Sequence, residues 1–114
     1  MTAETDPIKL KCYRMLQPTP EQSVSASQVI SDYLDSTPMV LNYELCRRIG
    51  TKSYVKCEYI SPVRSFKARG ALNLVHHLKV SGEASRLSTA STGNHGAAMS
   101  FACQEYSLPL TVCV

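Results

Sequence analysis

The sequence is poor in the features that mark a membrane protein or a nucleic-acid-binding surface. It has no tryptophan and two phenylalanines, and no apolar run approaches the roughly 20 residues that a helix needs to span a bilayer. A basic and then apolar start, typical of a secretory signal, is also missing. Twelve basic and nine acidic residues give a net charge of only +3, and the basic positions are scattered. We therefore expect no membrane or nucleic-acid partner, and a cytoplasmic location.

Paired cysteines are also missing. The five cysteines, at positions 12, 46, 57, 103 and 113, form no Cys-x-x-Cys pair and are odd in number. Zinc sites use closely paired cysteines, and disulfide frameworks use an even number of them. The pattern therefore predicts no metal site and no disulfide framework, and we expect reduced thiols.

Strand patterns alternate with helix patterns along the chain. Helices are predicted from Ser25, where Ser25 and Gln28 form a capping box, and over residues 43–49, which Gly50 follows. Strands are predicted at residues 8–12, 55–59, 87–90 and 110–114. Alternating strands and helices of this length are typical of an α/β fold with a largely parallel sheet.

Lys67 ends the tripeptide Ser65-Phe66-Lys67, which opens a predicted helix over residues 65–79 with Ser65 as its N-cap. Apolar side chains recur in this segment at near-helical spacing, at Ala68, Ala71, Leu72, Val75 and Leu78. A lysine in a first helical turn is usually a solvated surface residue. The positive end of the helix dipole also disfavours the ammonium form there, which suits a nucleophilic amine. The spacing alone leaves both interpretations open.

The hexapeptide Ser91-Thr92-Gly93-Asn94-His95-Gly96 stands between a predicted strand and a predicted helix over residues 97–103. A strand, a tight polar turn and a helix start direct consecutive backbone N–H groups to one point, which makes a site for an anion such as a carboxylate. Gly93 permits a positive φ or a close approach to a ligand, and Asn94 offers an amide donor. An ordinary helix N-cap would show the same residue types.

Together, in this order, the two motifs resemble the lysine motif and the asparagine loop of the fold-type II pyridoxal phosphate enzymes. Within that group the chain looks most like the serine and threonine dehydratases. The resemblance implies that Lys67 bonds the pyridoxal 5'-phosphate cofactor covalently and then moves a proton. It also implies that Phe66 and Asn94 contact the cofactor, and that Ser91, Thr92, Gly93, Asn94 and His95 hold the carboxylate of a small amino-acid substrate.

Two further segments resemble the same family. Thr37-Pro38 is similar to the Thr-Pro pair that opens the family's order of motifs, and Lys56-Cys57-Glu58 is similar to its strand ending in Lys-x-Glu. The resemblance implies a parallel-sheet fold-type II domain, of which residues 25–114 are the N-terminal part. Residues 1–24 are expected to be an N-terminal extension.

The implied reaction is the α,β-elimination of water from a hydroxy amino acid, giving a 2-oxo acid and ammonia. Serine racemase-like, threonine synthase-like and β-replacement chemistry share both motifs and stay open as alternatives. Thr92 stands where racemase-like members carry a serine that acts on the opposite face. Its branched side chain is more restricted, which favours elimination.

The chain closes on a predicted strand that ends at Val114, before the family's phosphate-binding loop. We therefore expect a truncated catalytic domain that forms a homo-oligomer or associates with the C-terminal portion of the family fold. A non-catalytic fragment or product that associates with a full-length partner is the alternative from a different functional class.

Overall fold

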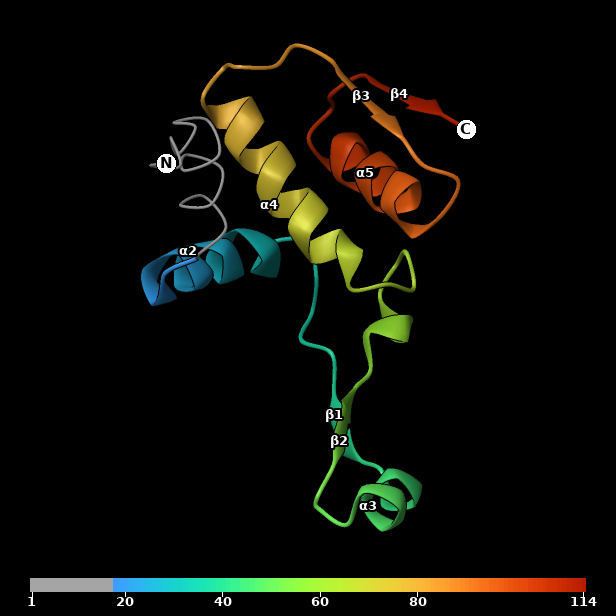
Figure 1. The fold of residues 1–114 in the computed structure, drawn as a ribbon. Helices are drawn as coiled ribbons and strands as arrows, with labels where there is room; N and C mark the ends of the chain where they lie inside the picture. The colour runs from blue at the N-terminus through green and yellow to red at the C-terminus, as the bar shows by residue number, and fades with distance from the viewer. Residues whose placement is uncertain (1–17) are drawn as a thin grey trace, which may run out of the picture.

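A computed structural model describes residues 18–114, so the strand expected at residues 8–12 lies outside the described residues. The elements are α2 (Pro20–Ser31), β1 (Met39–Leu41), α3 (Tyr43–Ile49), β2 (Tyr54–Lys56), the 3-10 turn η1 (Glu58–Ile60), α4 (Lys67–Val80), β3 (Leu87–Ala90), α5 (Asn94–Glu105) and β4 (Leu110–Cys113). Figure 1 shows a body of α2, α4, α5, β3 and β4, and an arm of β1, β2 and α3. No helix in the described part of the chain is long and apolar enough to cross a bilayer.

The hydrophobic core lies where α4 packs on α5. The apolar stripe predicted for the lysine helix is buried at Ala68, Ala71, Leu72 and Val75, while Leu78 is half-buried. Helix α5 contributes Ala98, Met99, Ala102 and Cys103, and Leu34 and Leu108 close the cluster. Leu72 and Val75 are fully buried, and burial of such side chains stabilises a fold by roughly 1.5–3 kcal/mol each. The core thus joins the two helices that carry the two sequence motifs.

Strands β3 and β4 form a parallel pair in which Leu87 lies opposite Leu110 and Ala90 lies opposite Cys113. This confirms the predicted strand at residues 87–90 and most of the one at residues 110–114. Helix α5 provides the crossover between them, as parallel strands require. The Ser91 amide donates to the Cys113 carbonyl at 3.0 Å, so the pairing continues into the turn after β3. The asparagine loop therefore starts at the carboxyl end of a parallel strand.

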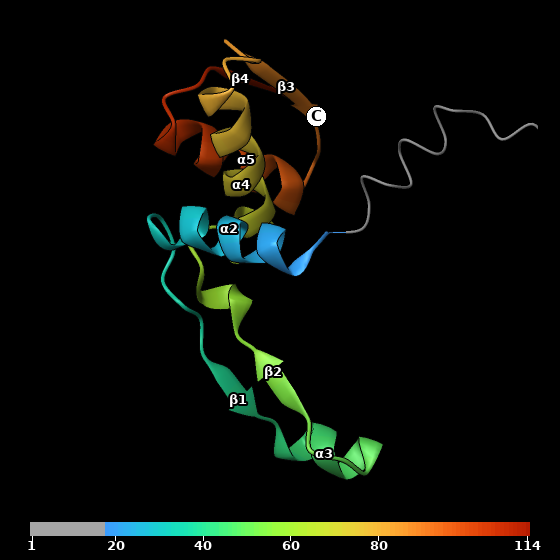
Figure 2. The same cartoon turned by 90° about the vertical axis from the view of Figure 1, so that its left-hand side faces the viewer.

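The arm differs from the largely parallel sheet that the sequence predicts. Strands β1 and β2 pair antiparallel, with Val40 opposite Val55. The strand expected over residues 55–59 ends at Lys56, because residues 58–60 turn into η1. Helix α3 confirms the predicted helix over residues 43–49, and Gly50 takes the left-handed conformation at its end with φ 75°. Figure 2 shows that the arm extends from one end of the body.

Two helices begin at residues other than those predicted. The capping box of α2 is formed by Thr19 and Gln22, not by Ser25 and Gln28, because Pro20 suits the first helical position and starts the helix earlier. Helix α2 therefore runs across residue 24, which is the expected boundary between the N-terminal extension and the catalytic domain. For α4 the N-cap position is occupied by Phe66, not Ser65. The Ser65 hydroxyl nevertheless accepts a hydrogen bond from the Lys67 amide at 3.3 Å.

A tight loop over residues 61–65 leads into α4. The Ser65 amide donates to Ser61 Oγ at 3.1 Å, and that hydroxyl donates to the Ser65 carbonyl at 3.2 Å. The Arg64 amide donates to the Ser61 carbonyl at 2.8 Å. Arg64 has φ 53°, in the left-handed region that costs residues other than glycine about 1–2 kcal/mol. The loop that precedes Lys67 is therefore closed by local hydrogen bonds, and Arg64 within it has a strained backbone.

Arg64→Gly should raise the free energy of unfolding by about 0.5–1 kcal/mol. Removing the Cβ relieves the left-handed strain, and the greater backbone entropy of glycine offsets part of the gain. Urea unfolding followed by circular dichroism would measure the change. Arg86→Gly is the matched control, because Arg86 is exposed and lacks a positive φ. A loss of stability in Arg64→Gly as large as in Arg86→Gly would contradict the strain argument.

Candidate active site

Lys67 is the first residue of α4, which confirms its predicted place in the first helical turn. Its side chain is exposed, and no residue of the described chain, 18–114, forms a hydrogen bond or ion pair with its amine. Phe66 beside it is 66% exposed. The amine therefore stands free in solvent at a helix N-terminus, where an anionic group nearby would be stabilised.

The Ser91 hydroxyl orders the asparagine loop. Ser91 Oγ accepts hydrogen bonds from the Gly93 amide at 3.2 Å and from the Gly96 amide at 3.0 Å. The structure assigns no acceptor within residues 18–114 to the backbone N–H groups of Thr92, Asn94 and His95. All three residues are exposed. Several donors at one helix N-terminus are thus available to an anion.

Helix α5 begins at Asn94, earlier than the predicted start at residue 97. Asn94 and His95 therefore lie in the first helical turn, and only Ser91, Thr92 and Gly93 form the turn between β3 and α5. The reason is that Gly93 takes the N-cap position, with the non-helical angles φ −148° and ψ −145°. Glycine is tolerated at this position, and the Ala97 amide donates to its carbonyl at 3.2 Å.

Gly96 brings the helix close to the strand edge. A Cβ at this position would lie 3.1 Å from the Ser91 carbonyl oxygen and 3.3 Å from Val112 Cγ1. Real Cβ atoms rarely approach other atoms so closely, so only glycine fits without movement of the backbone. The loop is therefore held against β4 by direct packing as well as by the Ser91 hydrogen bonds.

The structure brings the two motifs to the same end of the body. The N-terminal ends of α4 and α5 lie side by side in both views (Figures 1 and 2). The start of α4 carries the Lys67 amine. The start of α5 carries the Asn94 amide and the backbone donors that have no acceptor among residues 18–114. The positive ends of both helix dipoles therefore meet there. Such an arrangement combines a nucleophilic amine with a binding site for a carboxylate or phosphate.

A polar cluster beside the lysine helix was missed by the sequence interpretation. Arg69 Nε donates to Glu58 Oε2 at 2.9 Å, and the Thr37 hydroxyl donates to Glu58 Oε1 at 2.6 Å. The Arg69 and Thr37 hydrogen bonds lower the pKa of Glu58. Thr37 and Glu58 stood in segments that resemble the family, but nothing in their spacing indicated that they contact each other or Arg69.

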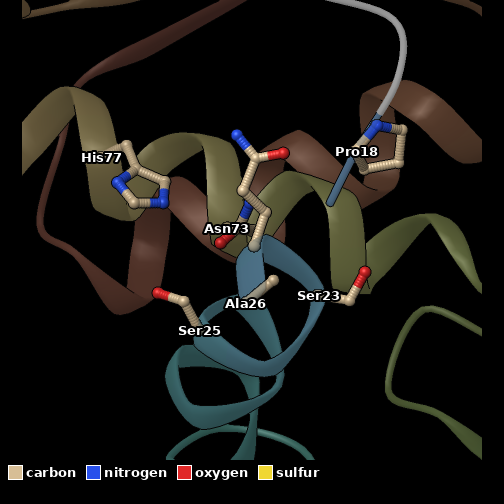
Figure 3. Close-up of a pocket in the computed structure, with 7 residues that line it drawn as sticks. Pro18, Ser23, Ser25, Ala26, Asn73 and His77 are labelled. Carbon is tan, nitrogen blue, oxygen red and sulfur yellow. The ribbon is translucent and has the colours of Figure 1, made fainter. Parts of the chain in front are cut away.

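A separate cavity of about 440 Å³ lies between α2 and α4. Figure 3 shows Asn73 and His77 of α4 facing Ser23, Ser25 and Ala26 of α2. The Asn73 Oδ1 atom is buried without a hydrogen-bond partner among residues 18–114. None of the residues named in the two motifs lines this cavity. The cavity is therefore separate from the place where the starts of α4 and α5 bring the two motifs together.

Comparison with known proteins identifies the family of the chain. The family model described as pyridoxal-phosphate dependent enzyme matches residues 30–114. The L-threo-3-hydroxyaspartate ammonia-lyase of Saccharomyces cerevisiae is 32% identical over 98 residues, which cover 86% of this chain and 30% of that protein. The biosynthetic L-threonine dehydratase of Staphylococcus aureus is 32% identical over 79 residues, which cover 69% of this chain and 19% of that protein.

A solved structure shows the same fold. The maize serine racemase structure aligns with a TM-score of 0.73 and 28% identity over 82% of this chain and 29% of the maize protein. Its similarity confirms the α/β fold-type II assignment for the part of the chain that aligns. The chain spans about a third or less of the length of these relatives. By the family match over residues 30–114, the chain belongs to the pyridoxal-phosphate dependent enzyme family.

Proposed function

We propose that the chain carries the lysine and carboxylate-binding parts of a dehydratase-like ammonia-lyase. The substrate would be a small hydroxy amino acid, and the products a 2-oxo acid and ammonia. The observation that carries the proposal is the exposed Lys67 amine at the start of α4, beside N–H groups at the start of α5 that have no acceptor among residues 18–114. The relatives named as a threonine dehydratase and a hydroxyaspartate ammonia-lyase support the same reaction class.

The residues at the two helix ends fit pyridoxal phosphate. The cofactor's aldehyde needs an uncharged amine, and Lys67 offers an amine that the described chain does not engage. Its ring hydroxyl needs a donor, which the exposed Asn94 amide can supply. Phe66 lies next to Lys67 with its ring exposed and would contact the cofactor ring. When bound, the cofactor supplies an electron sink for negative charge at the substrate's α carbon.

Each residue of the proposed site would then have one role in the reaction. Lys67 Nζ would hold the cofactor and afterwards take the α proton. The backbone N–H groups of Thr92, Asn94 and His95 would bind the substrate carboxylate, and the dipole of α5 would add to that attraction. The Ser91 hydroxyl keeps these donors in place, because it accepts the hydrogen bonds of Gly93 and Gly96. Loss of the β hydroxyl as water gives an enamine, which water then converts to the 2-oxo acid and ammonia.

Elimination is proposed over racemisation because of Thr92. Racemisation needs a second acid or base on the opposite face of the substrate, and the branched threonine side chain has fewer conformations with which to supply it. Relatives of both kinds resemble this chain, since the maize structure is a serine racemase. Threonine synthase-like and β-replacement reactions use the same lysine and loop and would differ in the substrate they accept.

A second candidate function is association with a partner, without catalysis by this chain. Its support is the arm, where Met39, Val40, Tyr43, Ile49 and Tyr54 are exposed. Large exposed apolar patches often mark protein interfaces. In this case the partner would be a second copy or a protein that carries the rest of the family fold.

Turnover by the purified chain tests both candidates. The chain would be mixed with pyridoxal phosphate and either L-serine or L-threonine, and both 2-oxo acid and D-amino acid would be measured. We expect 2-oxo acid in excess over D-amino acid, and none of either from Lys67→Ala. D-serine as the main product would overturn the elimination proposal. Turnover by a monomer in the same buffer would overturn the association candidate.

A further inference from the structure

We infer that Thr37, Glu58 and Arg69 form a positioning network that fixes the first turn of α4 and so the direction of the Lys67 amine. The part that concerns the amine rests on the proposed function of Lys67. None of the three side chains is a catalytic residue, because none belongs to the site that would touch substrate or cofactor.

The three side chains close a ring of hydrogen bonds. Arg69 Nε donates to Glu58 Oε2 at 2.9 Å, and Arg69 also donates to the Thr37 hydroxyl at 3.3 Å. That hydroxyl in turn donates to Glu58 Oε1 at 2.6 Å. Both carboxylate oxygens and two guanidinium nitrogens are therefore engaged. A planar guanidinium fork in such a ring has little freedom to rotate, which makes the contact directional.

The network is shielded from solvent, in contrast to the ion pairs of the arm. The side chains of Glu58 and Arg69 are 16% and 29% exposed, and Thr37 is 8% exposed. In α3, the Glu44 and Arg48 side chains that form an ion pair are 52% and 76% exposed. Exposed pairs contribute little to stability because water screens them and their side chains must be ordered. The Glu58 to Arg69 pair should therefore hold its geometry far better than the pairs of α3.

Arg69 reaches this network from the opposite side of the helix to Lys67. Residues two positions apart differ by roughly 200° around an α-helix, so the two side chains point away from each other. Arg69 can therefore fix the backbone of the first turn and leave the lysine amine without a bond to the network. The amides of Ala68 and Arg69 donate to the carbonyls of Ser65 and Phe66 at 3.4 and 3.2 Å. The first of these hydrogen bonds is longer than usual, which indicates a helix start that an outside anchor would stabilise.

The other end of the network belongs to the base of the arm. Thr37 precedes β1, and Glu58 follows β2. The Lys56 ammonium donates to the Thr37 carbonyl, and the Cys57 amide donates to the Pro38 carbonyl at 2.9 Å. The two strands of the arm are thus tied together where Glu58 meets Arg69. The start of the lysine helix is therefore anchored to a hydrogen-bonded hairpin and not to a free loop.

The test compares Thr37→Val, which keeps the shape of the side chain and removes its hydroxyl, with Thr37→Ser, which keeps the hydroxyl. Arg69→Lys removes the fork and keeps the charge, and Arg48→Lys on α3 is its matched control. Hydrogen exchange would be measured at the amides of Ala68 and Arg69. The rate of adduct formation between Lys67 and pyridoxal phosphate, and the pH dependence of the adduct's absorbance, would be measured on the same full chains.

We expect Thr37→Val and Arg69→Lys to speed exchange at both amides by about tenfold, as loss of a charged hydrogen bond predicts. They should also slow adduct formation and shift its pH profile, whereas Thr37→Ser and Arg48→Lys should match the parent. A merely structural role would leave the pH profile unchanged, so an unshifted profile would overturn the inference about the amine. If the parent chain formed no adduct at Lys67, the proposed function would be overturned and the network would not. If hydrogen exchange in Thr37→Val and Arg69→Lys matched the parent, the network itself would be overturned.

Discussion

Lys67→Ala should abolish the covalent adduct between the chain and pyridoxal phosphate. Only an amine can form the bond to the cofactor's aldehyde, and alanine offers none. Lys67 is exposed, and no residue of the described range engages its amine, so its loss should leave the fold intact. Borohydride reduction followed by mass mapping of the modified peptide would measure the adduct. We expect a single labelled lysine in the parent chain and none in the variant.

The control for Lys67 lies on the same helix. Lys79 is exposed in the last turn of α4, at the opposite end of the helix from Lys67 and from the asparagine loop. Lys79→Ala should therefore leave the labelling of Lys67 unchanged. Lys56 is a poorer control, because its ammonium donates to the Thr37 carbonyl at the base of the arm. Labelling of Lys67→Ala to the parent's extent would show that the cofactor reacts with surface lysines at random.

Gly96→Val should destabilise the chain by about 3 kcal/mol, at the upper end of the range for overpacked sites. Its Cβ would lie 3.1 Å from the Ser91 carbonyl oxygen and 3.3 Å from Val112 Cγ1 before the two methyl groups are added. The Ser91 oxygen belongs to the backbone between β3 and α5, so the loop itself must move to relieve the contact. We expect the hydrogen bond from the Gly96 amide to Ser91 Oγ to be lost as well. Urea unfolding would measure the change in the free energy of unfolding.

Gly70 in α4 provides the opposite case. A Cβ there would meet nothing within 4 Å, and alanine in a helix interior is favoured over glycine by about 1 kcal/mol. Gly70→Ala should therefore stabilise the chain, while Gly96→Val destabilises it. If both substitutions changed stability in the same direction, the close approach of α5 to the strand edge would not be the reason that position 96 holds glycine.

Much of the fold was predictable because local signals were strong. The stripe from Ala68 to Val75 gave α4 its buried face, and Gly50 marked the end of α3. The strand at residues 87–90 was predicted within its observed bounds despite its polar residues. Its side chains alternate between half-buried and exposed, because α5 covers one face of the pair. Helix starts were less predictable, since Thr19 and Ser25 both fit a capping pattern and Pro20 decided between them.

The two motifs of the candidate site could be predicted from the sequence, but their proximity in space could not. Lys67 and Asn94 belong to different helices, and only the packing of α4 on α5 brings the starts of those helices together. Contacts between residues distant in sequence leave no periodic signal, which is why the link between Thr37 and Arg69 was missed. Strand β1 was not predicted, because three residues are too few to show an alternating pattern, and its antiparallel pairing with β2 was missed with it.

Alanine is the commonest side chain where the two motif helices meet. Ala68, Ala71, Ala98 and Ala102 are buried in the cluster between α4 and α5. Methyl groups let helix axes approach closely, and interiors are packed too tightly to absorb an added methylene without movement. The separation between Lys67 and the turn at residues 91–93 is therefore determined by side chains that belong to neither motif. If the proposed site is correct, the packing of α4 on α5 sets the space between its two halves, so core substitutions at this interface would change the size of substrate it accepts while both motifs stay the same.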